Sequence, residues 1–144
     1  PALTALTGDF QERTGIETDF TPVVFRNRLD PEAKIALYRI AQEALTNIER
    51  HAGATHAAMD LRGHRNGATL RITDNGSGID PTQRKQGLGI GLRNMQERVE
   101  QLDGTLHISA PRGQSTGTII EATVPLTRLL PPEAKSRTTS RPNT

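Results

Sequence analysis

The segment Asp74-Asn75-Gly76-Ser77-Gly78 combines one carboxylate with two glycines, directly after an alternating strand-like run. An ionised carboxylate only accepts hydrogen bonds, and adenine offers a donor at its exocyclic amine where guanine presents an oxygen. An Asp at a strand end, with Gly76 and Gly78 leaving room for close approach, could therefore select adenine. Taken alone, such a segment more often forms a simple turn, and that interpretation stays open.

A second glycine cluster, Gly87-Leu88-Gly89-Ile90-Gly91-Leu92, precedes a predicted helix. Alternate glycines expose backbone N–H groups, and the start of a helix adds a positive dipole end, so the segment suits phosphate. A flexible loop before a helix would leave the same pattern. The spacing matches neither the Gly-x-Gly-x-x-Gly dinucleotide fingerprint nor a P-loop.

Glu43 and Asn47 are four residues apart in a predicted helix and therefore share one face. Magnesium takes oxygen ligands and shares them with substrate phosphates, so the Asn47 amide oxygen could hold this ion. Glu43 could take a proton or orient a nucleophile, and Arg50 could meet a phosphate. The alternative is an exposed polar face that carries an Arg39–Glu43 ion pair.

The bulk composition restricts the remaining possibilities. The 144 residues suit one domain, and 33% hydrophobic with 3% aromatic residues predicts a thin core of Leu, Ile, Val and Ala. The absence of cysteine excludes disulfides, and the four histidines show no zinc spacing. A net charge of +2, spread along the chain, argues against direct nucleic-acid binding. No apolar run reaches the ~20 residues of a membrane helix.

The elements that must position these residues follow from periodicity and stop signals. Asp30-Pro31 starts a helix over 31–52 that ends before Gly53. Alternating apolar residues around Asn66-Gly67 predict a hairpin that runs into Asp74. The other expected elements are a short helix at 3–10, a strand at 16–20, a helix at 92–102, and two closing strands at 106–108 and 120–124.

This order of elements predicts an α+β fold. Helices segregated from strands give a two-layer sandwich, with a mixed, mostly antiparallel sheet covered on one face by helices. Because the chain begins with Pro rather than Met, we expect it to be part of a longer protein. We expect residues 16–126 to form the folded domain, residues 1–15 to precede it, and residues 127–144 to be a disordered tail.

The fixed order of these motifs resembles the ATP-binding catalytic domain of bacterial sensor histidine kinases. This family shares a superfamily with gyrase, the Hsp90 chaperone and MutL, and the resemblance implies the Bergerat-type ATP-binding fold. The residues of these motifs are most similar to those of the subfamily that includes the nitrate/nitrite sensors. The matching stretches are Leu37–Asn47 with His51-Ala52, Asp74–Gly78, Gly87–Leu92 with Met95–Arg98, Gly117-Thr118 and Val124–Leu126.

The resemblance implies a role for each matching position. Asn47 would hold Mg²⁺ and Glu43 would assist attack by the acceptor imidazole, which makes these two the catalytic residues. Arg50 stands where the subfamily often has Lys, and would contact a phosphate. The ATP-binding residues would be Asn47, Arg50, Asp74 at the adenine amine, Gly76, Gly78, Gly87, Gly89, Gly91, Leu92 and Thr118.

The resemblance also implies partners. The family transfers the γ-phosphoryl group of ATP to a histidine on a separate dimerising hairpin, which this sequence lacks, and a response regulator follows. We therefore expect a monomeric donor domain in the cytoplasmic portion of a membrane-associated kinase, with residues 1–15 as the remnant of a linker helix. Two alternatives remain: an anti-sigma-type switch protein of the same fold that phosphorylates serine, and a degenerate scaffold without catalysis.

Overall fold

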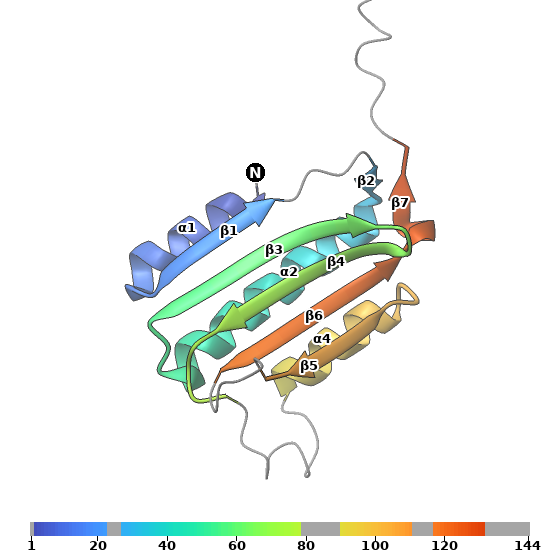
Figure 1. Cartoon of the computed structure of the whole chain (residues 1–144). Coiled ribbons are helices and arrows are strands. Elements are labelled where there is room, and N and C mark those ends of the chain that lie inside the picture. The colour runs from blue at the N-terminus through green and yellow to red at the C-terminus, as the bar shows by residue number, and fades with distance from the viewer. Residues whose placement is uncertain (1, 23–26, 79–89, 111–116, 132–144) are drawn as a thin grey trace, which may run out of the picture.

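A five-stranded sheet carries three helices on one face, which confirms the predicted two-layer α+β sandwich (Figure 1). The computed structural model describes residues 2–22, 27–78, 90–110 and 117–131. In chain order the elements are α1 Ala2–Thr14, β1 Glu17–Pro22, β2 Arg28–Leu29, α2 Pro31–Asn47, the π-helical turn η1 Ile48–Ala52, β3 His56–His64, β4 Gly67–Asp74, α4 Ile90–Glu100, β5 Thr105–Ser109, β6 Thr118–Pro125, the 3-10 turn η2 Leu126–Arg128 and β7 Leu129–Leu130.

The strands of the large sheet lie in the order β1-β3-β4-β6-β5. β1 runs parallel to β3, whereas all the other neighbours are antiparallel, so the predicted mixed and mostly antiparallel sheet is confirmed. The β3–β4 hairpin predicted from Asn66-Gly67 is present, with His64 opposite Gly67. Its two-residue turn is Arg65-Asn66, one position earlier than the sequence signal.

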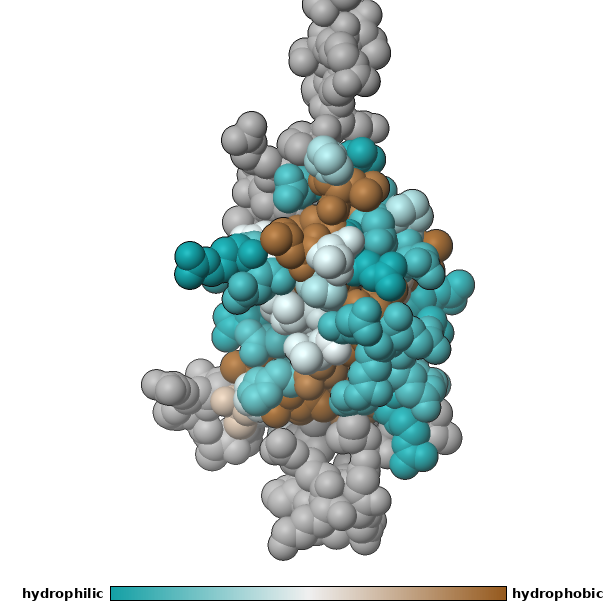
Figure 2. Space-filling view, turned by 90° about the vertical axis from the view of Figure 1, so that its right-hand side faces the viewer, coloured by the Kyte–Doolittle hydropathy of each residue, from teal (hydrophilic) through white to brown (hydrophobic). Residues whose placement is uncertain are grey.

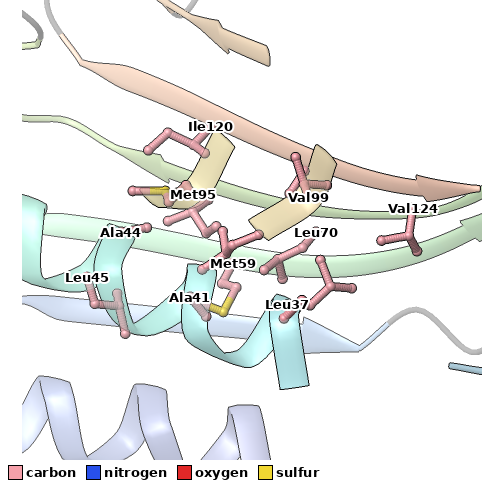
Figure 3. Packing of buried hydrophobic residues seen from close by; sticks show 14 of the residues in the cluster. Leu37, Ala41, Ala44, Leu45, Met59, Leu70, Met95, Val99, Ile120 and Val124 are labelled. Carbon is pink, nitrogen blue, oxygen red and sulfur yellow. The ribbon is translucent and has the colours of Figure 1, made fainter. Parts of the chain in front are cut away.

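The core lies between the sheet and α2 and α4 (Figure 3). The Asp30 carboxylate caps α2 by accepting a 2.7 Å hydrogen bond from the N–H of Ala33, as the Asp-Pro start predicts. α2 contributes several fully buried alanines, and the buried hydrophobic residues are mostly Ala, Leu, Ile and Val, as the composition predicts. The largest side chains that are fully buried are Leu37, Ile40, Met59, Leu70, Ile72, Met95, Val99 and Val124.

The predicted helix over 31–52 changes character after Asn47. α2 is α-helical as far as Asn47, and the next five residues, Ile48–Ala52, form the wider π-helical turn η1. Gly53 ends this turn with φ +60°, a left-handed conformation that favours glycine, so the predicted stop is confirmed. Isolated π turns are frequent at functional sites, and this one directly follows the predicted metal ligand.

The end of the described chain forms structure where the sequence predicts disorder. β7 pairs antiparallel with β2, a strand that the sequence also did not predict. Arg128 contacts Glu32 at 3.0 Å and Asp30 at 3.4 Å, which ties this end of the chain to the start of α2. The tail prediction is therefore wrong for Thr127–Leu130, and residues 132–144 lie outside the described residues.

The outer elements are packed onto the same core. Phe10 joins α1 to the core and is 2% exposed. Figure 2 shows hydrophobic surface near the upper end of the molecule, where Figure 1 places β7 and η2. Leu126 in η2 is half exposed, whereas Leu129 packs against the core. Among the described helices, none has the length and apolar character needed to cross a membrane.

Candidate functional site

The Asp74 carboxylate lies at the end of β4, on the face of the sheet that packs against the helices. Leu70 and Ile72 are buried on this face, and Asp74 is the next residue of the alternating series. Its partner in the neighbouring strand is Thr118, the first residue of β6, which is 8% exposed. Asp74 Oδ1 accepts a 2.8 Å hydrogen bond from the N–H of Gly76. Three residues predicted for the adenine end are therefore neighbours.

The electrostatics of Asp74 favour a ligand that carries a hydrogen-bond donor. Partial burial raises the pKa of its carboxyl group, and the hydrogen bond from Gly76 opposes this rise. Within the described residues, Oδ2 of Asp74 has no hydrogen-bond partner. A half-buried carboxylate oxygen gains most from a ligand that donates to it.

Two glycines, one after β4 and one before β6, lie close to each other. Gly78 has φ +83° and Gly117 has φ +105°, both in the region that favours glycine. A Cβ atom on Gly78 would lie 3.1 Å from the carbonyl oxygen of Gly117, tighter than most real contacts. The chain leaving β4 and the chain entering β6 therefore approach at a distance that a side chain would disturb.

Gly91, near the start of α4, lies directly against Glu43 and Asn47 of α2. A Cβ atom on Gly91 would lie 2.6 Å from Glu43 Oε2 and 3.3 Å from Asn47 Oδ1. α4 begins at Ile90, so the N–H groups of its first turn, which have no partner within the helix, adjoin this pair with their positive dipole end. The structure thus brings the helical pair together with the last glycine of the second cluster.

Glu43 and Asn47 keep their polar atoms available. Both side chains are half-buried, and neither forms a hydrogen bond or an ion pair with another residue in the described ranges. The alternative interpretation, an Arg39–Glu43 ion pair, is therefore absent from this part of the chain. No cluster of three or more His, Cys, Asp or Glu side chains suited to a metal occurs among the described residues.

Both groups of residues lie at one end of the sheet, the lower end in Figure 1, where α2 ends, β4 ends, β6 begins and α4 begins. α2 contacts α4, β4 and β6, so the Glu43/Asn47 pair and Asp74 lie on elements that pack against one another. Arg50 is exposed in η1, and Leu92 packs against the core. Gly87 and Gly89 lie outside the described residues. A ligand at this end would meet the Asp74 carboxylate, a helix start and a Glu/Asn pair.

Asn75 is a residue to which the sequence assigned no function, and the structure gives it several contacts. Its Oδ1 atom accepts hydrogen bonds of 3.0 Å from the N–H groups of Thr55 and His56. Its Nδ2 group donates a 2.9 Å hydrogen bond to Thr55 Oγ1. The only sequence signal was an Asn after a strand, because its partners lie 19 and 20 positions earlier.

An acid at a strand end and a Glu/Asn pair beside a helix start, on a mixed sheet backed by helices, define the class of α+β nucleotide-binding sandwiches. A family profile described as "Histidine kinase-, DNA gyrase B-, and HSP90-like ATPase" matches residues 32–128, more than half of the sequence. The chain belongs to this ATPase family.

Two similar curated proteins are named as histidine kinases. The chain is 44% identical over 128 residues to "Sensor histidine kinase MctS" of Rhizobium johnstonii, covering 86% of this chain and 27% of that protein. It is 38% identical over 127 residues to "Signal transduction histidine-protein kinase/phosphatase DegS" of Brevibacillus brevis, covering 88% of this chain and 32% of that protein. The predicted resemblance to histidine kinases is confirmed, whereas the nitrate-sensor subfamily stays a prediction. The chain spans less than a third of the length of either relative.

Solved structures share the fold. The histidine kinase domain of the blue-light activated kinase EL346 from Erythrobacter litoralis superposes with a TM-score of 0.72 at 20% identity, covering 87% of this chain and 63% of that chain. The ATP binding domain of PrrB from Mycobacterium tuberculosis gives a TM-score of 0.71 at 20% identity, covering 86% and 90%. At these identities the likeness supports the fold alone.

Proposed function

We propose that this chain binds Mg-ATP and donates the γ-phosphoryl group to a histidine on a separate dimerisation hairpin of a parent sensor kinase. The observation that carries the proposal is that Asp74, whose Oδ2 has no hydrogen-bond partner among the described residues, and the Glu43/Asn47 pair beside Gly91 lie at one end of the sheet. The 44% identity to a sensor histidine kinase supports the same function. The two curated relatives described above are both named as histidine kinases, so the serine-phosphorylating switch protein is not favoured.

Each end of the nucleotide has a complementary group. Asp74 Oδ2 would accept a hydrogen bond from the exocyclic amine of adenine, with Thr118 beside it. The free N–H groups at the start of α4 would face the phosphates. One amide oxygen, that of Asn47, fits a magnesium ion that takes its other ligands from phosphate and water. When bound, the ion neutralises the charge of the phosphates during transfer. Arg50, exposed in η1, is the proposed phosphate contact of the turn.

The proposed chemistry is a phosphoryl transfer in which positioning contributes most. An unprotonated ring nitrogen of the acceptor imidazole bonds to the γ-phosphorus while the bond to the β,γ-bridging oxygen breaks and ADP leaves. A neutral imidazole is already nucleophilic near neutral pH. The Glu43 carboxylate would accept a hydrogen bond from the other ring N–H, orient the ring, and take up the proton released after transfer.

The decisive experiment supplies the acceptor hairpin of the parent kinase with labelled ATP. We expect a phosphorylated hairpin whose label is lost in acid and kept in base, as for phosphohistidine. The isolated chain is expected to bind ATP as a monomer without labelling itself. Label on a serine would instead support the switch protein. In the cell we propose that the domain works on the cytoplasmic side, with a response regulator as the final acceptor.

Asn47→Asp is expected to weaken Mg²⁺-dependent ATP binding by about tenfold, because a second carboxylate beside Glu43 repels the triphosphate. Calorimetric titration of ATP at several free Mg²⁺ concentrations measures the effect. Asn66→Asp introduces the same charge in the distant β3–β4 turn and should leave binding unchanged. Unchanged ATP affinity in the Asn47 variant would contradict a place for this residue beside the phosphates and their ion.

A further inference from the structure

The Asn75 side chain fastens the end of β4 to the start of β3 beyond the last pair of the ladder. The ladder between these strands ends at Ala57 and Asp74. One residue further, the Asn75 N–H donates a 3.2 Å hydrogen bond to the carbonyl of His56. The amide then binds the N–H groups of both Thr55 and His56 through Oδ1, and the Thr55 hydroxyl through Nδ2. A single side chain thus holds two successive backbone donors and one side-chain acceptor.

The fastened segment is the chain that returns from the helical pair. From Asn47 the chain passes through η1 and Gly53, and reaches Thr55 within eight positions. Gly53 has no atom within 4 Å of an added Cβ, so its left-handed turn is not held by side-chain packing there. The Asn75 contacts therefore fix the distal end of the segment that leads from the C-terminal end of α2 into the sheet.

The same network continues to the outer strand. His56 Nδ1 lies 3.0 Å from Thr55 Oγ1, and His56 Nε2 lies 3.1 Å from Glu17 Oε1 of β1. All these side chains are exposed, so their contacts compete with water and add little to the core. Loss of Asn75 therefore should leave the folded domain intact while it releases the segment from the strand end.

We propose that Asn75 is a positioning residue that sets Asp74 relative to the Glu43/Asn47 pair, so that one nucleotide reaches both at once. This inference rests on the proposed ATP-binding function. The fit of a rigid ligand to two separated groups is sensitive to small displacements, so a shift of the β4 end weakens adenine recognition first. Asn75 itself touches neither base nor phosphate in this scheme.

The test compares ATP with ITP, which has an oxygen in place of the exocyclic amine. In the whole chain, Asn75→Ala is expected to weaken ATP binding about tenfold and to leave ITP binding nearly unchanged, so that selectivity falls by the same factor. Asn75→Asp keeps the acceptor oxygen for Thr55 and His56, and should retain most of the selectivity. Asn66→Ala, an exposed Asn at the other end of the hairpin, should behave like the wild type.

Amide hydrogen exchange supplies a second measurement on the same proteins. In Asn75→Ala, the N–H groups of Thr55 and His56 should exchange faster, whereas that of the core residue Leu70 should be unchanged. Wild-type selectivity in Asn75→Ala, or equal losses in the Ala and Asp variants, would overturn the inference. A wild-type chain that binds ATP and ITP equally would overturn the adenine assignment and this inference, whereas a wild-type chain that does not bind ATP would overturn the proposed function itself.

Discussion

Asp74→Asn is expected to weaken ATP binding by about 100-fold, equivalent to about 2.7 kcal/mol, because a charge-assisted hydrogen bond is replaced by two facing donors. The reason lies in the number of acceptor oxygens. Oδ1 of the carboxylate already accepts from the N–H of Gly76, and Oδ2 remains for the ligand. An amide has only one oxygen. If this oxygen accepts from the Gly76 N–H, the NH₂ group faces the adenine amine. If it accepts from the adenine amine, the Gly76 N–H loses its acceptor.

The same substitution is expected to raise, not lower, the stability at neutral pH. Burial raises the pKa of Asp74, so the ionised group is less favourable in the folded chain than in the unfolded chain. Its contribution to the free energy of unfolding falls as pH rises from about 3.8, its ordinary pKa, through the raised value. Asn carries no charge, so the variant should exceed the wild type at pH 7 and lose this advantage below about pH 3.8.

Calorimetric titration with ATP measures the loss of affinity, and urea unfolding at pH 7 and pH 3 measures the change in stability. Asp60→Asn provides a matched control, because Asp60 is half-buried in the neighbouring strand, on the other face of the sheet. That variant should bind ATP normally. An Asp74 variant that binds ATP with unchanged affinity would defeat the adenine assignment. A variant less stable than the wild type at pH 7 would contradict the electrostatic account of the carboxyl group.

Gly91→Ala is expected to lower the rate of phosphoryl transfer by about 100-fold while the domain stays folded, because a displaced acid–base group costs factors of this size. The added methyl would lie 2.6 Å from Glu43 Oε2. This oxygen is the end of a flexible side chain, so the carboxylate rotates away and the helices stay in place. Since Gly91 has no left-handed backbone and Ala favours helices, the unfolding free energy should change little or rise.

The measurement uses the parent kinase, with the initial rate of hairpin phosphorylation and the affinity for ATP taken separately. Gly8→Ala is the matched control, because Gly8 also lies in a helix and an added Cβ meets no atom within 4 Å. We expect a normal rate for this control. A normal rate in the Gly91 variant would mean that the position of the Glu43 carboxylate does not matter for transfer. A large loss of stability would show that the helices, not the carboxylate, had moved.

Local signals predicted the elements well because their causes are local. The cap at Asp30, the stop at Gly53 and the alternation that ends in Asp74 depend on neighbours within one or two turns. Pairing over long distances was not accessible in the same way. The amino-acid sequence of β1 does not specify a parallel partner in β3, and a two-residue strand such as β7 has no periodicity to detect.

For the candidate site too, local features were predictable and contacts between distant segments were not. The residue types at Glu43, Asn47 and Asp74 suggested their chemistry, but each alone had an equally ordinary interpretation. The close approach of Gly91 to Glu43 depends on how two helices pack, and sequence spacing does not give this distance. Asn75 was overlooked for a similar reason, since its amide acts on residues that come before the hairpin. Local chemistry was predictable, whereas its arrangement required the fold.

The place of β6 in the sheet has a consequence for synthesis on the ribosome. β6 is the last strand of the large sheet to be made, yet it lies between β4 and β5. Until it emerges, β4 and β5 each present an unpaired edge, and the Asp74 position lacks its neighbour Thr118. The nascent chain therefore completes its ligand site and its protection from aggregation in one late step. Truncation before β6 should yield a polypeptide that needs a chaperone and that ATP cannot rescue.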